Sequence, residues 1–308
     1  MKLAFAEKRT LNGIIATTAV CLTVLLVAII ACADDDLIKR VRGYFGIVPD
    51  LDREVDFVRF IDVGQGDCAL IQSNGRTLLI DTGDLDTQIS LCSKLNNYGI
   101  SRIDATVISH FHMDHIGGLE AIAERFFLPN LIMPVMGSPQ EGTDAAKSAS
   151  VVVRESDGGV YTAVQGMNFI LGDFDITVLY YPDIAAAEEE NDRSLFLMAK
   201  IGDKKFLFTG DAEAAAEEQL LGAGLNIDCD VLKVAHHGSA SSTGEAFLDA
   251  CTPEYAAISC GKDNTYGHPD DNVLSRLEKR KIGLYRTDIS GDITFYVENG
   301  GIRVETEY

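Results

Sequence analysis

The stretch VISHFHMDHIGG, residues 107–118, holds three of the six histidines of this 308-residue chain. His110 and His112 stand two positions apart at the end of an apolar run, so in extended backbone both imidazoles leave on the same side. Asp114 and His115 follow where a turn leads into a helical pattern. One short loop can therefore offer His110 and His112 to one metal ion and Asp114 and His115 to a second.

The remaining histidines occupy two further loops. His236 and His237 lie in VAHHGS, His268 lies in YGHP, and both motifs follow apolar runs typical of strands. Since no histidine lies outside these three clusters, we expect them to converge on one site. Asp211 in LFTGD also follows an apolar run, and its carboxylate could bridge two divalent metal ions. Imidazole and carboxylate ligands favour Zn, Mn or Fe over Mg or Ca, and we expect Zn or Mn.

Strand-like runs alternate with helical patterns from residue 55 onward. VDFVRFIDV, CALIQS and TLLIDTG are β-type runs, and TQISLCSKLNNYG is a helical pattern that stops at Gly99. SLFLMAKIG followed by KKFLFTGD predicts a hairpin, and an Asn-Gly-Gly turn predicts another near the C-terminus. The whole pattern predicts one α+β domain over residues 55–308, with two packed sheets and helices outside them.

The composition limits the kinds of partner. A formal net charge of −21 argues against a nucleic-acid partner held by a broad basic surface, because such a surface draws on clustered Lys and Arg. An anionic substrate would therefore need a local source of attraction. Five cysteines lie beyond residue 32 without a C-x-x-C pair, so we expect mostly buried free thiols and at most one disulfide.

Residues 1–32 form a predicted membrane or export segment. Residues 11–31 are almost uncharged and long enough to cross a bilayer, with Lys2, Lys8 and Arg9 before them. The basic flank should stay in the cytoplasm, which places the rest of the chain outside the cell. We interpret the segment as an uncleaved anchor or a lipoprotein-type signal ending at Cys32, with a cleaved signal peptide as the alternative. Residues 33–54 would then be a spacer.

Several motifs occur in order over about residues 56–295. They are DVGQGDCALI, LLIDTG, HFHMDHIGG, NDRSLFL, LFTGD, LKVAHHGSASST and NTYGHPDDNVLSRL. By them the chain resembles the metallo-β-lactamase fold superfamily, and most closely the exported hydrolase domain of ComEC-type competence proteins, which take up DNA. The resemblance implies an αββα sandwich with the metal ions at one edge. It also implies that Asp211 bridges the ions, that His236 is the late ligand of the second ion, and that Asp81 orients a ligand.

One ligand of the superfamily pattern is missing. Many members have a further histidine before the bridging aspartate, whereas no histidine occurs here between His115 and His236. Beside the two histidines of the loop and Asp211, the first ion would be completed by water or by a substitute from NDRS, either Asn191 or Asp192. The gap argues against a true β-lactamase.

The expected activity is hydrolysis of an anionic phosphodiester, possibly DNA, by a membrane-attached extracellular phosphodiesterase or nuclease. Two metal ions can lower the pKa of a shared water and stabilise the charge that develops at phosphorus. Asp114 and His268 are the candidate catalytic residues, with His268 as a proton donor to the leaving group. The candidate substrate contacts are His237, Ser239, Ser242, Thr243, Asn264 and Tyr266. Of these, His237 could instead pack behind His236, and Ser242 or Thr243 could cap the helix near Glu245.

Two other functions stay open at this point. The fold hosts many chemistries, so a cell-wall phosphodiester such as teichoic-acid phosphocholine, or a lactone or other ester, is an alternative substrate. A non-catalytic binding subunit of a DNA-uptake apparatus is the alternative of another class. The near-complete ligand set weighs against it, whereas the missing histidine favours it. The sequence indicates a membrane contact through the N-terminal segment, and no stable protein partner is evident from it.

Overall fold

Short apolar runs build the first of two sheets. The structure is a computed structural model and describes residues 55–136, 142–182 and 189–308. Strands of the first sheet follow the order β15-β14-β1-β2-β3-β4-β5-β6. Their bounds are Asp56–Phe60 (β1), Ala69–Ser73 (β2), Arg76–Ile80 (β3), Ala105–Val107 (β4), Asn130–Met133 (β5), Gly159–Thr162 (β6), Ile293–Glu298 (β14) and Gly301–Thr306 (β15).

The second sheet has the order β13-β12-β11-β10-β9-β8-β7. Its strands are Asn168–Leu171 (β7), Phe174–Tyr180 (β8), Phe196–Ile201 (β9), Lys204–Phe208 (β10), Val231–Lys233 (β11), Tyr255–Ile258 (β12) and Gly283–Arg286 (β13). β9 and β10 pair antiparallel across Gly202 and Asp203, which confirms the hairpin predicted there. From β10 to β13 the neighbouring strands are parallel.

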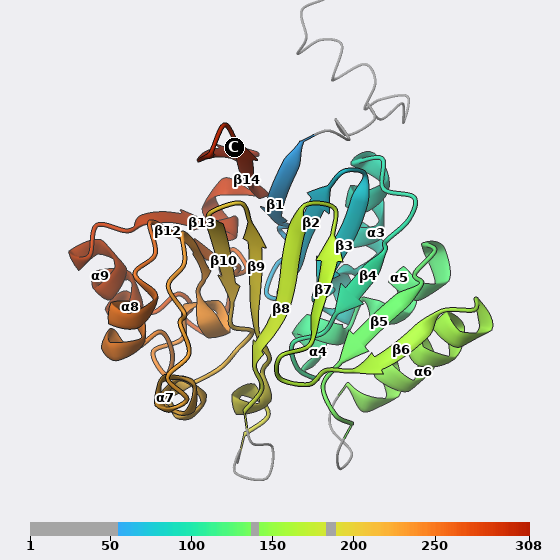
Figure 1. The fold of residues 1–308 in the computed structure, drawn as a ribbon, viewed down its shortest axis with the longest axis horizontal. Helices are drawn as coiled ribbons and strands as arrows, with labels where there is room; N and C mark the ends of the chain where they lie inside the picture. The colour runs from blue at the N-terminus through green and yellow to red at the C-terminus, as the bar shows by residue number, and fades with distance from the viewer. Residues whose placement is uncertain (1–54, 137–141, 183–188) are drawn as a thin grey trace, which may run out of the picture. The chain divides into compact units, whose positions relative to one another are not determined.

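Helices cover the outer faces of both sheets. The first sheet carries Gln88–Asn97 (α3), Leu119–Arg125 (α5) and Thr143–Glu155 (α6), and the second carries Ala214–Gly222 (α7), Glu245–Cys251 (α8) and Asp271–Lys279 (α9), as Figure 1 shows. The main core lies between the sheets, where Phe60, Phe206 and Phe295 pack with ring centroids 5.8 to 6.4 Å apart. The predicted αββα sandwich is confirmed.

Two local predictions are also confirmed. β14 and β15 form the C-terminal hairpin, and its turn residues Asn299 and Gly300 have φ of 53° and 74°. Positive φ at both positions is what a two-residue hairpin turn requires, and Asn-Gly satisfies it at low cost. The five cysteines of the described residues are buried free thiols.

The predicted N-terminal segment lies outside the described residues. Within the part that is described, the helices are too short or too polar to cross a membrane. The anchor or lipoprotein signal therefore stays a prediction from the sequence.

The start of α8 differs from the expectation that Ser242 or Thr243 caps it. The N-cap is Gly244, which has no side chain to cap the helix. A carboxylate from another helix bonds to the backbone there instead. Glu217 of α7 accepts hydrogen bonds from the backbone amides of Thr243 at 2.5 Å and Gly244 at 3.0 Å. The Ser242 and Thr243 hydroxyls bond to the backbone of Ala235 instead. Glu217 thus ties α7 to the loop that follows the histidine pair.

Glu217 should make stability depend on pH. Burial raises the pKa of its carboxyl to about 7 from an ordinary 4.5, against the opposing pull of the Gly244 and Thr243 amides. Between these values the unfolded chain has lost a proton that the folded chain keeps, so the free energy of unfolding falls as pH rises from about 4.5 to 7. Glu217→Gln should remove a decrease of the order of 3 kcal/mol, measured by denaturant unfolding across this window.

The exposed neighbour Glu218 offers a matched control for this measurement. Glu218→Gln should leave the slope of stability against pH as it is in the parent chain. A Glu217→Gln variant with the parent slope would contradict the assignment of the effect to this carboxyl.

Candidate metal centre

Loops at the strand ends bring the chemistry-bearing residues to one edge of the sandwich. The loop after β4 carries His110 and His112 and runs into the short helix α4 (Met113–Ile116), which carries Asp114 and His115. Asp211 follows β10. The turn η3 (Ala235–Gly238), which follows β11, carries the histidine pair.

Two glycines explain how tightly the first loop packs. A Cβ on Gly117 would lie 2.2 Å from the backbone nitrogen of Leu85, and one on Gly118 would lie 2.2 Å from the backbone oxygen of Thr82. Both contacts are impossible for any larger residue without backbone movement. The GG of the opening motif therefore lets α4 lie directly against the loop that follows β3.

One complete ligand set consists of Asp114, His115, Asp211 and His237, whose ligand atoms all lie within 4.8 Å of one another. His115 Nε2 is 3.2 Å from Asp211 Oδ2. His237 Nε2 is 3.3 Å from the same oxygen and 3.1 Å from Asp114 Oδ2. His237 thus occupies the place that the sequence analysis assigned to His236, and it faces this cluster instead of packing behind its neighbour.

Hydrogen bonds on the far side of each ring select the tautomer that a metal ligand needs. His115 Nδ1 donates to Asp81 Oδ2 at 2.9 Å, and His237 Nδ1 donates to the carbonyl of Ser259 at 2.9 Å. When the ring is neutral, as a metal ligand must be, each Nε2 is then left with a lone pair toward the cluster. Asp81 itself accepts bonds from the backbone amide and hydroxyl of Ser109, both at 2.7 Å. The position of Asp81 agrees with the orienting role implied by the resemblance.

A second, smaller set begins with His110 and His112. His110 Nε2 and His112 Nδ1 are 3.1 Å apart, and the ring of His110 lies 4.1 Å from that of His115, so the two sets adjoin. Burial, together with the neighbouring charge of His115, lowers the pKa of His110, which favours the neutral imidazole that binds metal.

The two candidates for completing this first set have different surroundings. Asn191 lines the same cavity, and its buried Oδ1 has no hydrogen-bond partner among the described residues. Asp192 Oδ1 instead accepts bonds from the backbone amides of Glu213 at 3.1 Å and Ala216 at 3.3 Å, at the start of α7. The geometry therefore favours Asn191 over Asp192.

Unpaired buried atoms show that the cluster fits cations. His115 Nε2 and Asp211 Oδ1 are buried and lack a hydrogen-bond partner among the described residues. Burial disfavours a charged His115, yet the carboxylates of Asp211, Asp114 and Asp81 outweigh it and raise the pKa of this imidazole. Carboxylates that favour a protonated histidine favour any positive charge at the same place. Divalent metal ions are therefore suited to this cluster.

The sequence analysis missed a buried ion pair beneath the cluster. Lys233, at the end of β11, is 3% exposed, and its Nζ is paired with Asp67 and lies 3.9 Å from Asp211 Oδ1. Burial disfavours the ammonium, but the charges of Asp67 and Asp211 outweigh it and raise its pKa. In the sequence, Asp67 lies in the motif DVGQGD and Lys233 in the motif LKVAHH. Nothing in either motif shows that these two residues contact each other.

The cavity over the cluster has a volume of about 350 Å³. Beside the ligands it is lined by Gln65, Asp84, Met113, Asn191, His236, Tyr266 and His268. Gln65 was not predicted: its Oε1 accepts a hydrogen bond from the Gly261 amide at 3.0 Å, which orients its side chain at the wall. His236 Nδ1 lies 3.1 Å from Glu213 Oε1, so this imidazole is held at the cavity by a carboxylate.

The predicted substrate contacts divide into two groups. Tyr266 and His268 line the cavity, whereas Ser242 and Thr243 are buried in backbone contacts away from it. The Asn264 side-chain amide forms hydrogen bonds with the backbone of its own loop, at Gly261 and His268. The Ser239 hydroxyl pairs with the Ser241 hydroxyl at 2.9 Å on the surface.

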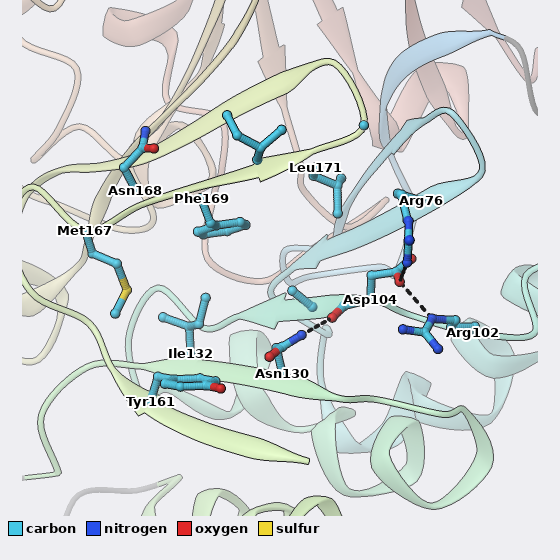
Figure 2. Close-up of a pocket in the computed structure, with 13 residues that line it drawn as sticks. Arg76, Arg102, Asp104, Asn130, Ile132, Tyr161, Met167, Asn168, Phe169 and Leu171 are labelled. Atoms are coloured by element: carbon cyan, nitrogen blue, oxygen red, sulfur yellow. Dashed lines mark hydrogen bonds and ion pairs between the residues drawn. The ribbon is translucent and has the colours of Figure 1, made fainter. Parts of the chain in front are cut away.

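A larger cavity of about 480 Å³ lies elsewhere, between β7 and the β5–β6 end of the first sheet. Figure 2 shows its apolar wall around Phe169 and Ile132, with Arg76 and Arg102 converging on one carboxylate. Arg76 and Arg102 contact Asp104 Oδ1 at 2.8 and 2.7 Å. No histidine is among the described residues that line it, so the candidate metal centre belongs to the smaller cavity.

Two sheets with helices outside them and a histidine and aspartate cluster at one edge define an αββα protein with a candidate metal centre. The family model described as the metallo-beta-lactamase superfamily matches residues 61–262. The chain belongs to this superfamily, whose fold binds divalent metal ions.

Two competence proteins are similar in sequence. ComE operon protein 3 of Bacillus subtilis (strain 168) is 31% identical over 317 residues, which covers 95% of this chain and 37% of that protein. Competence protein ComA of Neisseria gonorrhoeae is 32% identical over 246 residues, covering 79% of this chain and 33% of that protein. The chain thus spans about a third of the length of these relatives.

A solved structure is similar in fold alone. The metallo-beta-lactamase fold protein YhfI from Bacillus subtilis matches with a TM-score of 0.51 over 75% of this chain and 95% of that one, at 14% identity.

Proposed function

We propose that this chain is a metal-dependent phosphodiesterase that cleaves DNA outside the cell and is attached to the membrane by its N-terminal segment. The observation that carries the proposal is the meeting of two ligand sets at one cavity, with Asp211 among them. The similarity to competence proteins along most of the chain supports DNA as the substrate. A phosphodiester also suits a cavity whose described lining offers amide and imidazole donors.

The chain's own residues divide the work. The ligands Asp114, His115, Asp211 and His237 would hold one divalent ion, and His110, His112 and Asn191 the other. Such ions, Zn or Mn, supply an activated water and positive charge at the phosphoryl oxygens. Asp81 and the carbonyl of Ser259 hold the rings of His115 and His237 in the orientation that this requires.

His268 is placed to serve the leaving group. It lines the cavity, and its Nδ1 is buried without a hydrogen-bond partner among the described residues. Burial and the neighbouring charges of His237 and His236 lower the pKa of this imidazole. The lowered pKa keeps this imidazole neutral near pH 7, and a neutral imidazole still carries one N–H that can hydrogen-bond to a departing oxygen, so His268 is the leaving-group contact of the proposed reaction.

The purified full chain should hydrolyse short DNA strands and bis(p-nitrophenyl) phosphate with Mn or Zn present, and chelation should remove this activity. Metal analysis should find two divalent ions per chain after loading. The same panel includes p-nitrophenylphosphocholine and an N-acyl homoserine lactone. If the chain hydrolyses either of these compounds and does not cleave DNA, the proposal of DNA as the substrate is wrong. Tight metal binding without turnover on any member would favour a binding subunit.

A further inference from the structure

The rim of the metal cavity carries one exposed aromatic side chain. Tyr266 lines the cavity and is 71% exposed. Among the exposed large apolar and aromatic residues of the described ranges, it alone lines this cavity. A tyrosine ring held open beside a reactive centre leaves apolar surface in water, which suits a residue that contacts a ligand.

The loop that presents Tyr266 is built around Asn264. The Asn264 Oδ1 accepts hydrogen bonds from the backbone amides of Tyr266 at 3.2 Å and His268 at 3.1 Å. Its Nδ2 donates to the carbonyls of Gly261 at 2.9 Å and His268 at 2.6 Å. One side chain thus closes the loop with four bonds, so the backbone that carries Tyr266 is fixed before a ligand arrives and its ordering costs little on binding.

A row of rings leads from Tyr266 to the metal ligands. Tyr266 packs edge to face on His268 with centroids 6.0 Å apart, and His268 lies 5.4 Å from His236. The ring of His236 is 6.2 Å from that of His237, which belongs to the ligand set. His268 also lies 6.5 Å from His237, so a single imidazole separates the ring of Tyr266 from the ligand set, and a strand bound at the reacting centre can extend to it.

The described lining of the cavity lacks basic side chains, so the Tyr266 ring contributes more to holding a strand than it would in a basic groove. None of the described residues that line the cavity is Lys or Arg. Phosphates on either side of the scissile one therefore gain little from the lining, and the strand has to be held by its bases. Stacking of a base on an aromatic side chain is sequence-tolerant and requires the base to be unpaired.

We propose that Tyr266 is a base-stacking residue that makes this site selective for a phosphodiester beside an unpaired nucleobase, as in single-stranded nucleic acid. The inference rests on the proposed phosphodiesterase function and goes beyond it by naming the substrate feature and its contact. A quaternary ammonium group, the other ligand that aromatic rings bind, is normally enclosed by several rings. Tyr266 stands here as a single exposed ring, which favours a flat base.

The test compares two strands of equal length, an oligothymidylate and a fully abasic strand, and the quantity measured is the ratio of their kcat/KM values. In the parent chain the thymidine strand should be preferred. Tyr266→Ala should lower the ratio about tenfold, mainly through KM, because one stacked base is lost. Tyr266→Phe should keep it, since the ring stays. Tyr161→Ala, which removes an exposed tyrosine from the larger cavity, should also keep it.

A second arm locates the contact. One thymine moved stepwise along an otherwise abasic strand should restore the preference at a single position beside the cleaved bond. Equal losses on both strands in Tyr266→Ala would overturn the proposal, because they would show that the ring only supports the loop. If Tyr266→Ala lowers the turnover of p-nitrophenylphosphocholine, the base-stacking proposal is overturned, and the ring binds a quaternary ammonium group instead.

A binding measurement separates this inference from the proposed activity. In the Asp114→Ala background, fluorescence anisotropy of a labelled oligothymidylate should show weaker binding when Tyr266→Ala is added, with no such change for the abasic strand. If the parent chain cleaves no strand but this difference persists, the phosphodiesterase proposal fails and the stacking contact stands. If the difference is absent, the stacking contact fails whatever the activity.

Discussion

Replacement of Asp114 by alanine should abolish phosphodiester hydrolysis and leave the fold intact. Asp114 Oδ2 lies 3.1 Å from His237 Nε2, and the side chain is about a quarter exposed at the cavity, so its removal opens no void in the core. A residue that only orients a ligand typically costs about 10–100-fold when it is lost. A direct ligand should cost more, and one divalent ion per chain should disappear from the metal analysis.

Activity, metal content and thermal unfolding of the variant should be measured together. Asp144→Ala is the matched control, because the Asp144 side chain is 98% exposed and pairs only with Lys147 in the described contacts. The control should keep both activity and metal. An Asp114→Ala chain that retains its full metal content and rate would show that the ligand set is wrongly assigned.

Among the variants discussed, replacement of Lys233 by methionine should lower the free energy of unfolding the most. Lys233 and Asp67 are 3% and 5% exposed and form an ion pair beneath the metal cluster. Without the ammonium, the carboxylates of Asp67 and Asp211 are buried without that compensation. Breaking a buried pair in this way costs about 3–5 kcal/mol, so the metal-free variant should lose that much of its free energy of unfolding in a denaturant titration.

Two further variants test the cause. Lys204→Met removes a lysine whose pair with Asp230 is more open, with side chains 19% and 23% exposed, and should cost far less stability than Lys233→Met. Combining Lys233→Met with Asp67→Leu should recover much of the loss, because the uncompensated carboxylate is gone. If the single variant is as stable as the parent chain, the pair does not contribute as described.

Local patterns were sufficient for much of the fold. The spacing of His110, His112, Asp114 and His115 predicted a ligand loop because strand and turn geometry act over a few residues. The hairpin at Asn299 and Gly300 was also predictable, since its conformation depends on residues adjacent in sequence. The αββα arrangement followed from the order of strands and helices.

Other features depended on contacts between distant segments. His236 and His237 are adjacent and both have positive φ, 48° and 52°, so no periodic rule decides which imidazole faces the cluster. The choice follows from Ser259, whose carbonyl accepts from His237, and from Glu213, which lies against His236. The cap of α8 is similar, because Glu217 reaches it from another helix.

The sequence by itself determined the ligand-rich loop and the two-sheet class, because these follow from local spacing and from the order of elements. It also predicted that the six histidines converge, because all of them lie in loops after strand-like runs. Only the tertiary structure decided that His237 lies in the candidate ligand set, that Lys233 and Asp67 pair beneath it, and that Tyr266 stands at its rim. The physical reason is that burial, charge compensation and ring orientation depend on neighbours brought together by folding, which spacing along the chain does not encode.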